Sequence, residues 1–112
     1  MQQYNHTNYG EILKNKPIRS PKHLKYVRSK PCMIKNDEGL NCNMEVVAHH
    51  TTFLKGKRGI SQKVGDNYTI PICFSHHHNL HYIGEKLFWK MHDYELDQVL
   101  NYANTLWSES NE

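Results

Sequence analysis

The segment from Cys73 to His81 most constrains this chain, because five of its nine side chains can bind a metal ion. Seven of the nine histidines in the 112-residue chain lie between His49 and His92. This length predicts one domain, and such a domain buries only about 60–68% of its unfolded surface. With 38% hydrophobic residues, the core is thin, so we expect a metal or a partner to add stability.

The expected state of the three cysteines depends on the cellular compartment, which the sequence helps to predict. The first 16 residues are polar and lack an export-signal pattern, and the chain has no run of 18 apolar residues. We therefore expect a cytoplasmic protein without membrane contact. In a reducing compartment, cysteines are metal ligands or free thiols before they are disulfides.

One predicted metal site combines cysteines with a histidine. Cys73 and His76 have the Cys-x-x-His spacing at an expected strand-to-helix corner, which is half of a structural zinc site. Cys32 and Cys42 would supply the other half, although the nine residues between them exceed the usual two to four. The predicted ligands of a structural Zn²⁺ are therefore Cys32, Cys42, Cys73 and His76, and three free thiols in a small core are the alternative.

A second constellation consists of histidine pairs. His77 and His81 are four residues apart, so they share one face of a helix and can bind one divalent ion. His49 and His50 end an expected strand, where adjacent side chains point to opposite faces. One imidazole can then face a metal while the other takes a proton from water near neutral pH. A run of solvated histidines is the alternative interpretation.

Positive charge is concentrated in residues 1–65, which hold 12 Lys and Arg against 4 Asp and Glu, whereas residues 66–112 hold 2 against 7. Two acid-free clusters, one on an expected helix and one in a glycine-rich loop, favour contact with a polyanion, most commonly nucleic acid. A solvated face is the alternative. The candidate phosphate-binding residues are Lys22, Lys25, Arg28, Lys55, Lys57, Arg58 and Lys63.

Local signals predict the regular elements. Ser20 and Pro21 are typical of a helix start, and Pro31 ends that helix. Residues 45–49 and 68–73 are expected as strands. The later elements are a helix capped by Ser75 and ended by Gly84, a short helix over residues 85–92 with Leu87, Phe88 and Met91 inward, and a last helix that starts at Asp93 and packs through Leu96, Val99, Leu100, Ala103 and Trp107.

These motifs resemble the HNH, or His-Me finger, nuclease superfamily. Its pattern is an Asp-His or His-His pair on a first strand, an Asn or Asp before a second strand, and then Cys-x2-Cys-His-x3 followed by Asn or His. His49-His50 match the pair, and residues 73–81 match the last part with His76 in place of the second cysteine. Over about residues 21–107, the chain is similar to phage-type recombination-enhancement nucleases of the Ref kind.

The resemblance implies an α+β fold, built as a small ββα-metal finger with a zinc-stapled knuckle and flanking helices. The expected organisation is a flexible basic N-terminal segment at residues 1–19, an HNH-like nuclease domain at 20–108 and a tail at 109–112. The family pattern has a further cysteine three residues after Cys32, where this chain has Lys35, and we expect Cys42 to take its place.

The resemblance also implies roles for single residues. His49, His77 and His81 would hold a catalytic Mg²⁺, Mn²⁺ or Zn²⁺, and His50 would be the general base. Asp66 takes the place of the residue that orients the base or steadies its loop, and Asn67 is the competing candidate. His78 matches no position of the pattern, and we expect it to be exposed.

The function implied is a metal-dependent endonuclease that hydrolyses DNA phosphodiester bonds in phage or prophage recombination or DNA processing. Its expected location is the cytoplasm of a bacterial cell or phage-infected host, with DNA and a recombinase–DNA filament as partners. A non-catalytic, zinc-stapled nucleic-acid-binding module is the alternative. A histidine-rich metal-handling protein is a third hypothesis, which the basic clusters disfavour because nearby positive charge opposes cation capture.

Overall fold

The computed structural model describes residues 17–34, 42, 45–51 and 64–111. In these residues the chain forms a small α+β fold, the class expected from the sequence, with four helices around a two-stranded sheet. The elements in chain order are α2 (Pro21–Arg28), β1 (Val46–His50), the 3-10 turn η4 (Asp66–Tyr68), β2 (Thr69–Cys73), α3 (Phe74–Ile83), α4 (Glu85–Met91) and α5 (Leu96–Ser110).

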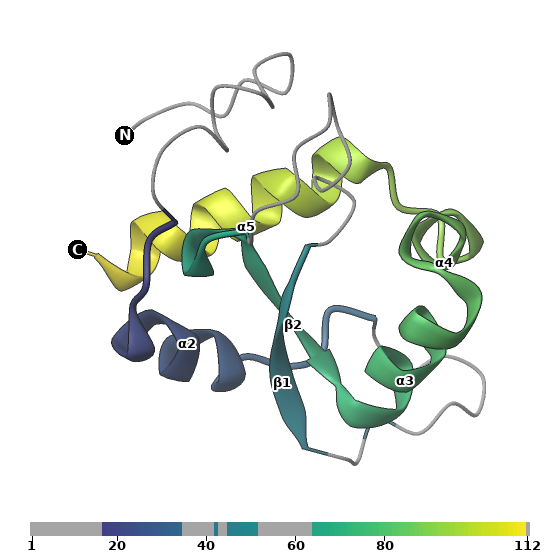
Figure 1. The fold of residues 1–112 in the computed structure, drawn as a ribbon, viewed down its shortest axis with the longest axis horizontal. Helices are drawn as coiled ribbons and strands as arrows, with labels where there is room; N and C mark the ends of the chain where they lie inside the picture. Colours follow the sequence, from purple (N-terminus) through teal and green to yellow (C-terminus); the bar gives the residue numbers. More distant parts are fainter. Residues whose placement is uncertain (1–16, 35–41, 43–44, 52–63, 112) are drawn as a thin grey trace.

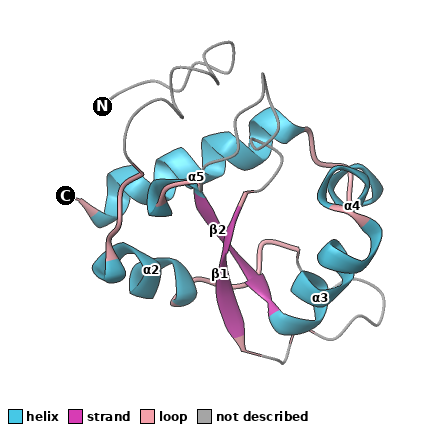
Figure 2. Cartoon of the chain, viewed as in Figure 1, coloured by secondary structure: helices cyan, strands magenta, loops and turns pink. Residues whose placement is uncertain are grey.

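The two strands form an antiparallel ribbon at the centre of the molecule (Figure 2). In Figure 1, α2 lies to the left of this ribbon, α3 and α4 lie to the right, and α5 runs along the top. All five residues of β2 are buried, because helices contact the ribbon from more than one side. The register pairs His49 with Ile70 and His50 with Thr69, so both histidines sit at one end of the ribbon.

The core is built mainly from β2, α4 and α5. Phe88 and Trp89 are fully buried. Leu87 and Met91, expected to point inward, are instead 50% and 61% exposed. The prediction was wrong because the inner face of α4 includes the buried acid Glu85, which interrupts the apolar periodicity from which a helix face is predicted.

The start of α2 agrees with its sequence signals. The Ser20 side chain accepts a hydrogen bond from the backbone N–H of His23 at 3.2 Å, and Pro21 is the first helical residue. Such a cap satisfies one of the backbone donors that every helix start leaves open. The buried side chains of His23 and Val27 face the rest of the protein, which leaves the basic residues of α2 on its outer side.

Two other helix starts differ from the predictions. Helix α3 begins at Phe74, with Cys73 rather than Ser75 as its N-cap and no side-chain cap. The last helix begins at Leu96, not at Asp93, which has a positive φ of 63° and belongs to the preceding turn. A capping box between Glu95 and Gln98 fixes its start.

Residues next to both expected domain boundaries take part in the fold. The carbonyl of Ile18 accepts a hydrogen bond from the N–H of Asp66 at 2.8 Å, so the end of the 1–19 segment is bound to the domain. Helix α5 extends to Ser110, which places two residues of the expected 109–112 tail in a helix. Within the described ranges, no helix has the length and apolar character needed to cross a membrane.

Candidate functional site

Three cysteines and one histidine converge between the segment after α2 and the start of α3. The Nδ1 atom of His76 lies 3.2 Å from the Sγ of Cys73, 3.5 Å from that of Cys42 and 3.6 Å from that of Cys32. Cys32, Cys73 and His76 are buried, and Cys42 is partly buried. These four predicted residues, which we call the thiol group, are therefore close enough to hold one metal ion.

The spacing of these atoms fits a tetrahedral metal. Typical Zn–S and Zn–N bonds at the tetrahedral angle separate sulfur from nitrogen by about 3.5 Å, which is close to the three distances here. Burial, followed by the neighbouring Cys32, raises the pKa of the Cys42 thiol to about 12. Cys42 is therefore a neutral thiol near pH 7 unless a cation offsets the repulsion between the closely packed thiolates.

A separate cluster, the histidine group, brings together His49 from β1 with His77 and His81 from α3. The Nε2 atom of His77 lies 3.2 Å from Nδ1 of His49 and 3.1 Å from Nε2 of His81. His49 is buried, His77 is partly buried and His81 is exposed. These three predicted residues come together as one group of possible metal ligands with an exposed side.

Hydrogen bonds alone do not account for both close contacts of Nε2 of His77. A neutral imidazole has one N–H and one lone pair, so a single hydrogen at Nε2 of His77 cannot serve two linear hydrogen bonds. Three imidazole nitrogens bound to one ion lie about 3.3 Å apart, close to the distances here. Burial, followed by the charges of His49 and His81, lowers the pKa of His77 to about 4, so its ring is in the neutral form that binds metals.

A buried acid that was given no role from the sequence holds the far side of the His49 ring. Oε2 of Glu85 lies 3.0 Å from Nε2 of His49 and accepts a hydrogen bond from the indole N–H of Trp89 at 3.0 Å. The His49 and Glu85 side chains are only 2% and 5% exposed. The sequence signal was an acidic residue followed four positions later by a tryptophan, on the inner face of a short helix.

His50 lies on the opposite face of β1 and contacts Asp66 in η4. Its Nε2 atom lies 2.8 Å from Oδ1 of Asp66, and 39% of its side chain is exposed. Asp66 also accepts the N–H of Ser20 at 2.7 Å and contacts Arg19 at 3.5 Å. Burial alone would raise the pKa of Asp66, but the hydrogen bonds from His50 and Ser20 and the charges of His50 and Arg19 lower it.

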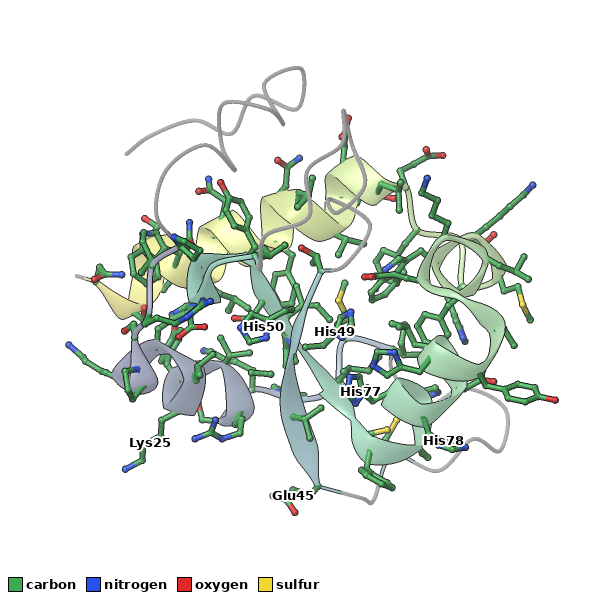
Figure 3. The ribbon with its side chains drawn as sticks, viewed as in Figure 1. Lys25, Glu45, His49, His50, His77 and His78 are labelled. Atoms are coloured by element: carbon green, nitrogen blue, oxygen red, sulfur yellow. The ribbon has the colours of Figure 1, made fainter. Side chains whose placement is uncertain are left out.

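Figure 3 shows that His49 and His77 lie together on one side of β1, whereas His50 lies on the other side. This arrangement follows from the alternation of side chains along a strand, as the sequence predicted. Of the two candidate partners for His50, Asp66 makes the contact. The side chain of Asn67 lies against Gly65 and Tyr68 instead.

The predicted phosphate-binding residues and His78, which was assigned to no site, complete the comparison with the sequence. Lys22, Lys25 and Arg28 are exposed on α2, and Lys25 points outward in Figure 3. His78 is exposed, as expected. The basic loop residues Lys55, Lys57, Arg58 and Lys63 lie outside the described residues.

The fold and the site define a small α+β protein in which the thiol group and the histidine group are each close enough to hold a metal ion. Residues 6–105 match the family described as "Protein of unknown function (DUF968)". Because this match covers most of the chain, the protein belongs to that family. No curated protein and no solved structure matches the chain significantly.

Proposed function

We propose that this protein is a metal-dependent endonuclease that hydrolyses DNA phosphodiester bonds. The proposal rests on one observation at the end of β1. His49 contacts two histidines of α3 on one face of the strand, and its neighbour His50 pairs with Asp66 on the other face. A ligand group next to an imidazole that is not itself a ligand is the minimum that metal-assisted hydrolysis requires. The resemblance to HNH nucleases extends the proposal to phage or prophage DNA processing, with a recombinase–DNA filament as a partner.

His50 is the proposed general base. Because Asp66 accepts a hydrogen bond from Nε2 of His50, the lone pair of the neutral ring is on Nδ1. The side chain is partly exposed, so water and substrate can reach it. Nδ1 would take the proton of the attacking water, and the Asp66 carboxylate would stabilise the imidazolium that forms.

His49, His77 and His81 are the proposed ligands of the catalytic ion, and their exposed side leaves room for substrate. A divalent cation bound there would stabilise the charge that develops on the phosphate and the leaving oxygen. The thiol group would hold a structural Zn²⁺, since three thiolates and one imidazole are a donor set typical of such sites.

Exposed basic side chains support DNA as the substrate. Lys22, Lys25 and Arg28 lie along α2, and Arg19 extends this positive surface to Asp66, the partner of His50. Contacts of this type bind phosphates without specifying sequence. This positive surface therefore favours a nuclease that binds the DNA backbone next to its general base.

Plasmid nicking in Mg²⁺ or Mn²⁺ tests the proposal with two matched variants. His50→Ala should lower nicking by about 10²–10⁴-fold, the usual contribution of a general base, while DNA binding and the fold are retained. His78→Ala removes an exposed histidine outside both ligand groups and should nick like the wild type. Equal nicking by His50→Ala and the wild type would contradict the role of His50.

The thiol group and the basic face also favour a second candidate, a zinc-stapled module that binds nucleic acid without cleaving it. This function needs neither His50 nor the histidine group. It predicts DNA affinity that falls steeply with salt and no nicking in any divalent ion. Cleavage that disappears in both His50→Ala and His77→Ala would exclude it.

A further inference from the structure

We infer that Glu85 is a positioning residue, whose carboxylate fixes the His49 ring so that its Nδ1 lone pair faces His77 and His81. The inference rests on the proposed function in one respect, namely that the histidine group binds a cation. It assigns a role to a side chain that lies 36 residues from His49 in the sequence.

The tautomer of His49 follows from the contacts of its two ring nitrogens. A neutral imidazole carries one proton, and a carboxylate oxygen 3.0 Å from Nε2 can only accept. The proton is therefore on Nε2, and the lone pair is on Nδ1, the atom 3.2 Å from His77. Without the carboxylate, the proton could occupy Nδ1 and block the nitrogen that would bind the metal.

Trp89 holds Glu85 in place. Its indole N–H donates to the same oxygen that faces His49, and its ring is fully buried. Glu85 and Trp89 are four residues apart on α4, so they share a face of that helix. One carboxylate oxygen, Oε2, is thereby held between the buried indole of Trp89 and the imidazole of His49.

The turn at Gly84 places Glu85 and Trp89 next to the two-stranded ribbon. Gly84 has a φ of +97° and forms the break between α3 and α4, a conformation that costs glycine little. Because of this turn, one continuous segment contacts the His49 ring from two directions. His77 and His81 of α3 face Nδ1 of His49, and Glu85, at the start of α4, reaches Nε2 on the far side of the ring.

The same contacts explain how the acid Glu85 can be buried. A carboxylate taken out of water is costly unless donors or a positive charge compensate it. Here two N–H groups bind it directly. A cation on the other side of the imidazole would complete a carboxylate–histidine–metal chain, in which the outer carboxylate raises the basicity of the ligand.

Calorimetry on the full chain tests the inference. The thiol group is first filled with Zn²⁺, and Co²⁺ is then titrated into the wild type, Glu85→Gln and Glu109→Gln. Glu85→Gln should bind Co²⁺ about 10–100-fold more weakly, the usual effect of losing an outer carboxylate. Glu109→Gln makes the same charge change on the exposed end of α5 and should match the wild type.

The outcomes separate the inference from the function on which it rests. If the wild type does not bind Co²⁺, the histidine group is not a cation site and both are overturned. If the wild type binds Co²⁺ and Glu85→Gln binds it equally well, the role of Glu85 is overturned while the nuclease proposal stands.

A measurement on the wild type covers the case in which Glu85→Gln does not fold. Long-range ¹H–¹⁵N correlation spectra report which ring nitrogen of each histidine carries the proton. We expect the His49 proton on Nε2 in the zinc-loaded protein before Co²⁺ is added. A proton on Nδ1 of His49 would overturn the inference.

Discussion

His49 and His50 are adjacent, and each is held at Nε2 by a buried carboxylate, from Glu85 and Asp66 respectively. In both rings this contact leaves Nδ1 with the lone pair. Strand alternation then places the two Nδ1 atoms in different surroundings, since Nδ1 of His49 faces His77 whereas the side chain of His50 is partly exposed. Two neighbouring residues of one type thus differ in their contacts, which is the basis of the separate roles proposed for them.

At this scale we predict that Asp66→Asn lowers the free energy of unfolding at pH 7 by about 1–2 kcal/mol, because hydrogen bonds to a charged group are stronger than neutral ones. The pKa of Asp66 is lowered from 3.8 in the folded protein. Its carboxylate therefore stabilises the fold above that value, and the contribution is lost as pH falls through the folded pKa.

Urea denaturation of both proteins between pH 7 and pH 4 and below checks this prediction. The difference in unfolding free energy between the wild type and Asp66→Asn should persist down to about pH 5 and narrow near and below the unfolded pKa of the carboxyl group. A difference that does not narrow below that pKa would refute the ionised role of Asp66.

Site residues were predictable where the sequence encodes local spacing. The separations of Cys73 from His76 and of His77 from His81 identify side chains that can share a site, and that of His49 from His50 identifies side chains that point apart. The structure arranges them accordingly. Glu85 was assigned no role because its pairing with His49 spans two helices and the sheet. Spacing rules describe single elements, so a contact of this range was beyond them.

At the scale of elements, α3 serves both ligand groups. Its N-cap Cys73 and His76 belong to the thiol group, and His77 and His81 belong to the histidine group. Adjacent residues of one helical turn therefore point to two candidate metal centres. A change in the position of α3 would therefore disturb the thiol group and the histidine group together.

The break after α3 provides the element-scale prediction. Gly84→Ala should lower the free energy of unfolding by about 1–3 kcal/mol, the cost of a residue with a side chain at a strained positive φ. The cost is conformational, since within the described part of the chain no atom outside Gly84 and its two chain neighbours lies within 4 Å of the added methyl. Lys86→Ala, at an exposed position of α4, is the control, expected to change stability by less than about 0.5 kcal/mol.

Urea denaturation of the zinc-loaded proteins measures both variants. Equal stability of Gly84→Ala and the wild type would show that the turn between α3 and α4 tolerates a side chain. The placement of Glu85 would then not depend on glycine at this position.

Two helix boundaries were predicted correctly from single residues, whereas the start of α3 and the inner face of α4 were not. Ser20 and Pro21 begin α2, and Gly84 ends α3, as expected. Ser75 does not cap α3, because the strand leads directly into the helix at Phe74. The inner face of α4 was wrong because seven residues give too short a periodic pattern to outweigh one buried acid.

At the scale of the whole molecule, the core is small and the thiol group lies at its edge. Cys32 and Cys73 belong to the buried apolar cluster, and Cys42 packs against it. A metal ion there would link the segment after α2 to the start of α3. Structural zinc in small domains contributes about 10–16 kcal/mol of apparent binding free energy, as much as the whole stability of a typical domain.

We therefore predict that a strong chelator, which removes Zn²⁺ from the thiol group, abolishes cooperative thermal unfolding. His77→Ala, which disrupts only the histidine group, should keep its cooperative transition. Circular dichroism melts of the zinc-loaded and chelated proteins make the comparison. Identical melting curves with and without the chelator would mean that the fold does not need the metal.

The most direct test of the two-site arrangement is the metal content per chain of zinc-saturated protein, before and after mild chelation. The wild type and His78→Ala should hold two ions and lose one on mild chelation, because three imidazoles with an open side bind less tightly than three buried thiolates and an imidazole. His77→Ala should hold one ion throughout. If His77→Ala and the wild type bind equal amounts of metal before chelation, the three histidines do not form a cation site.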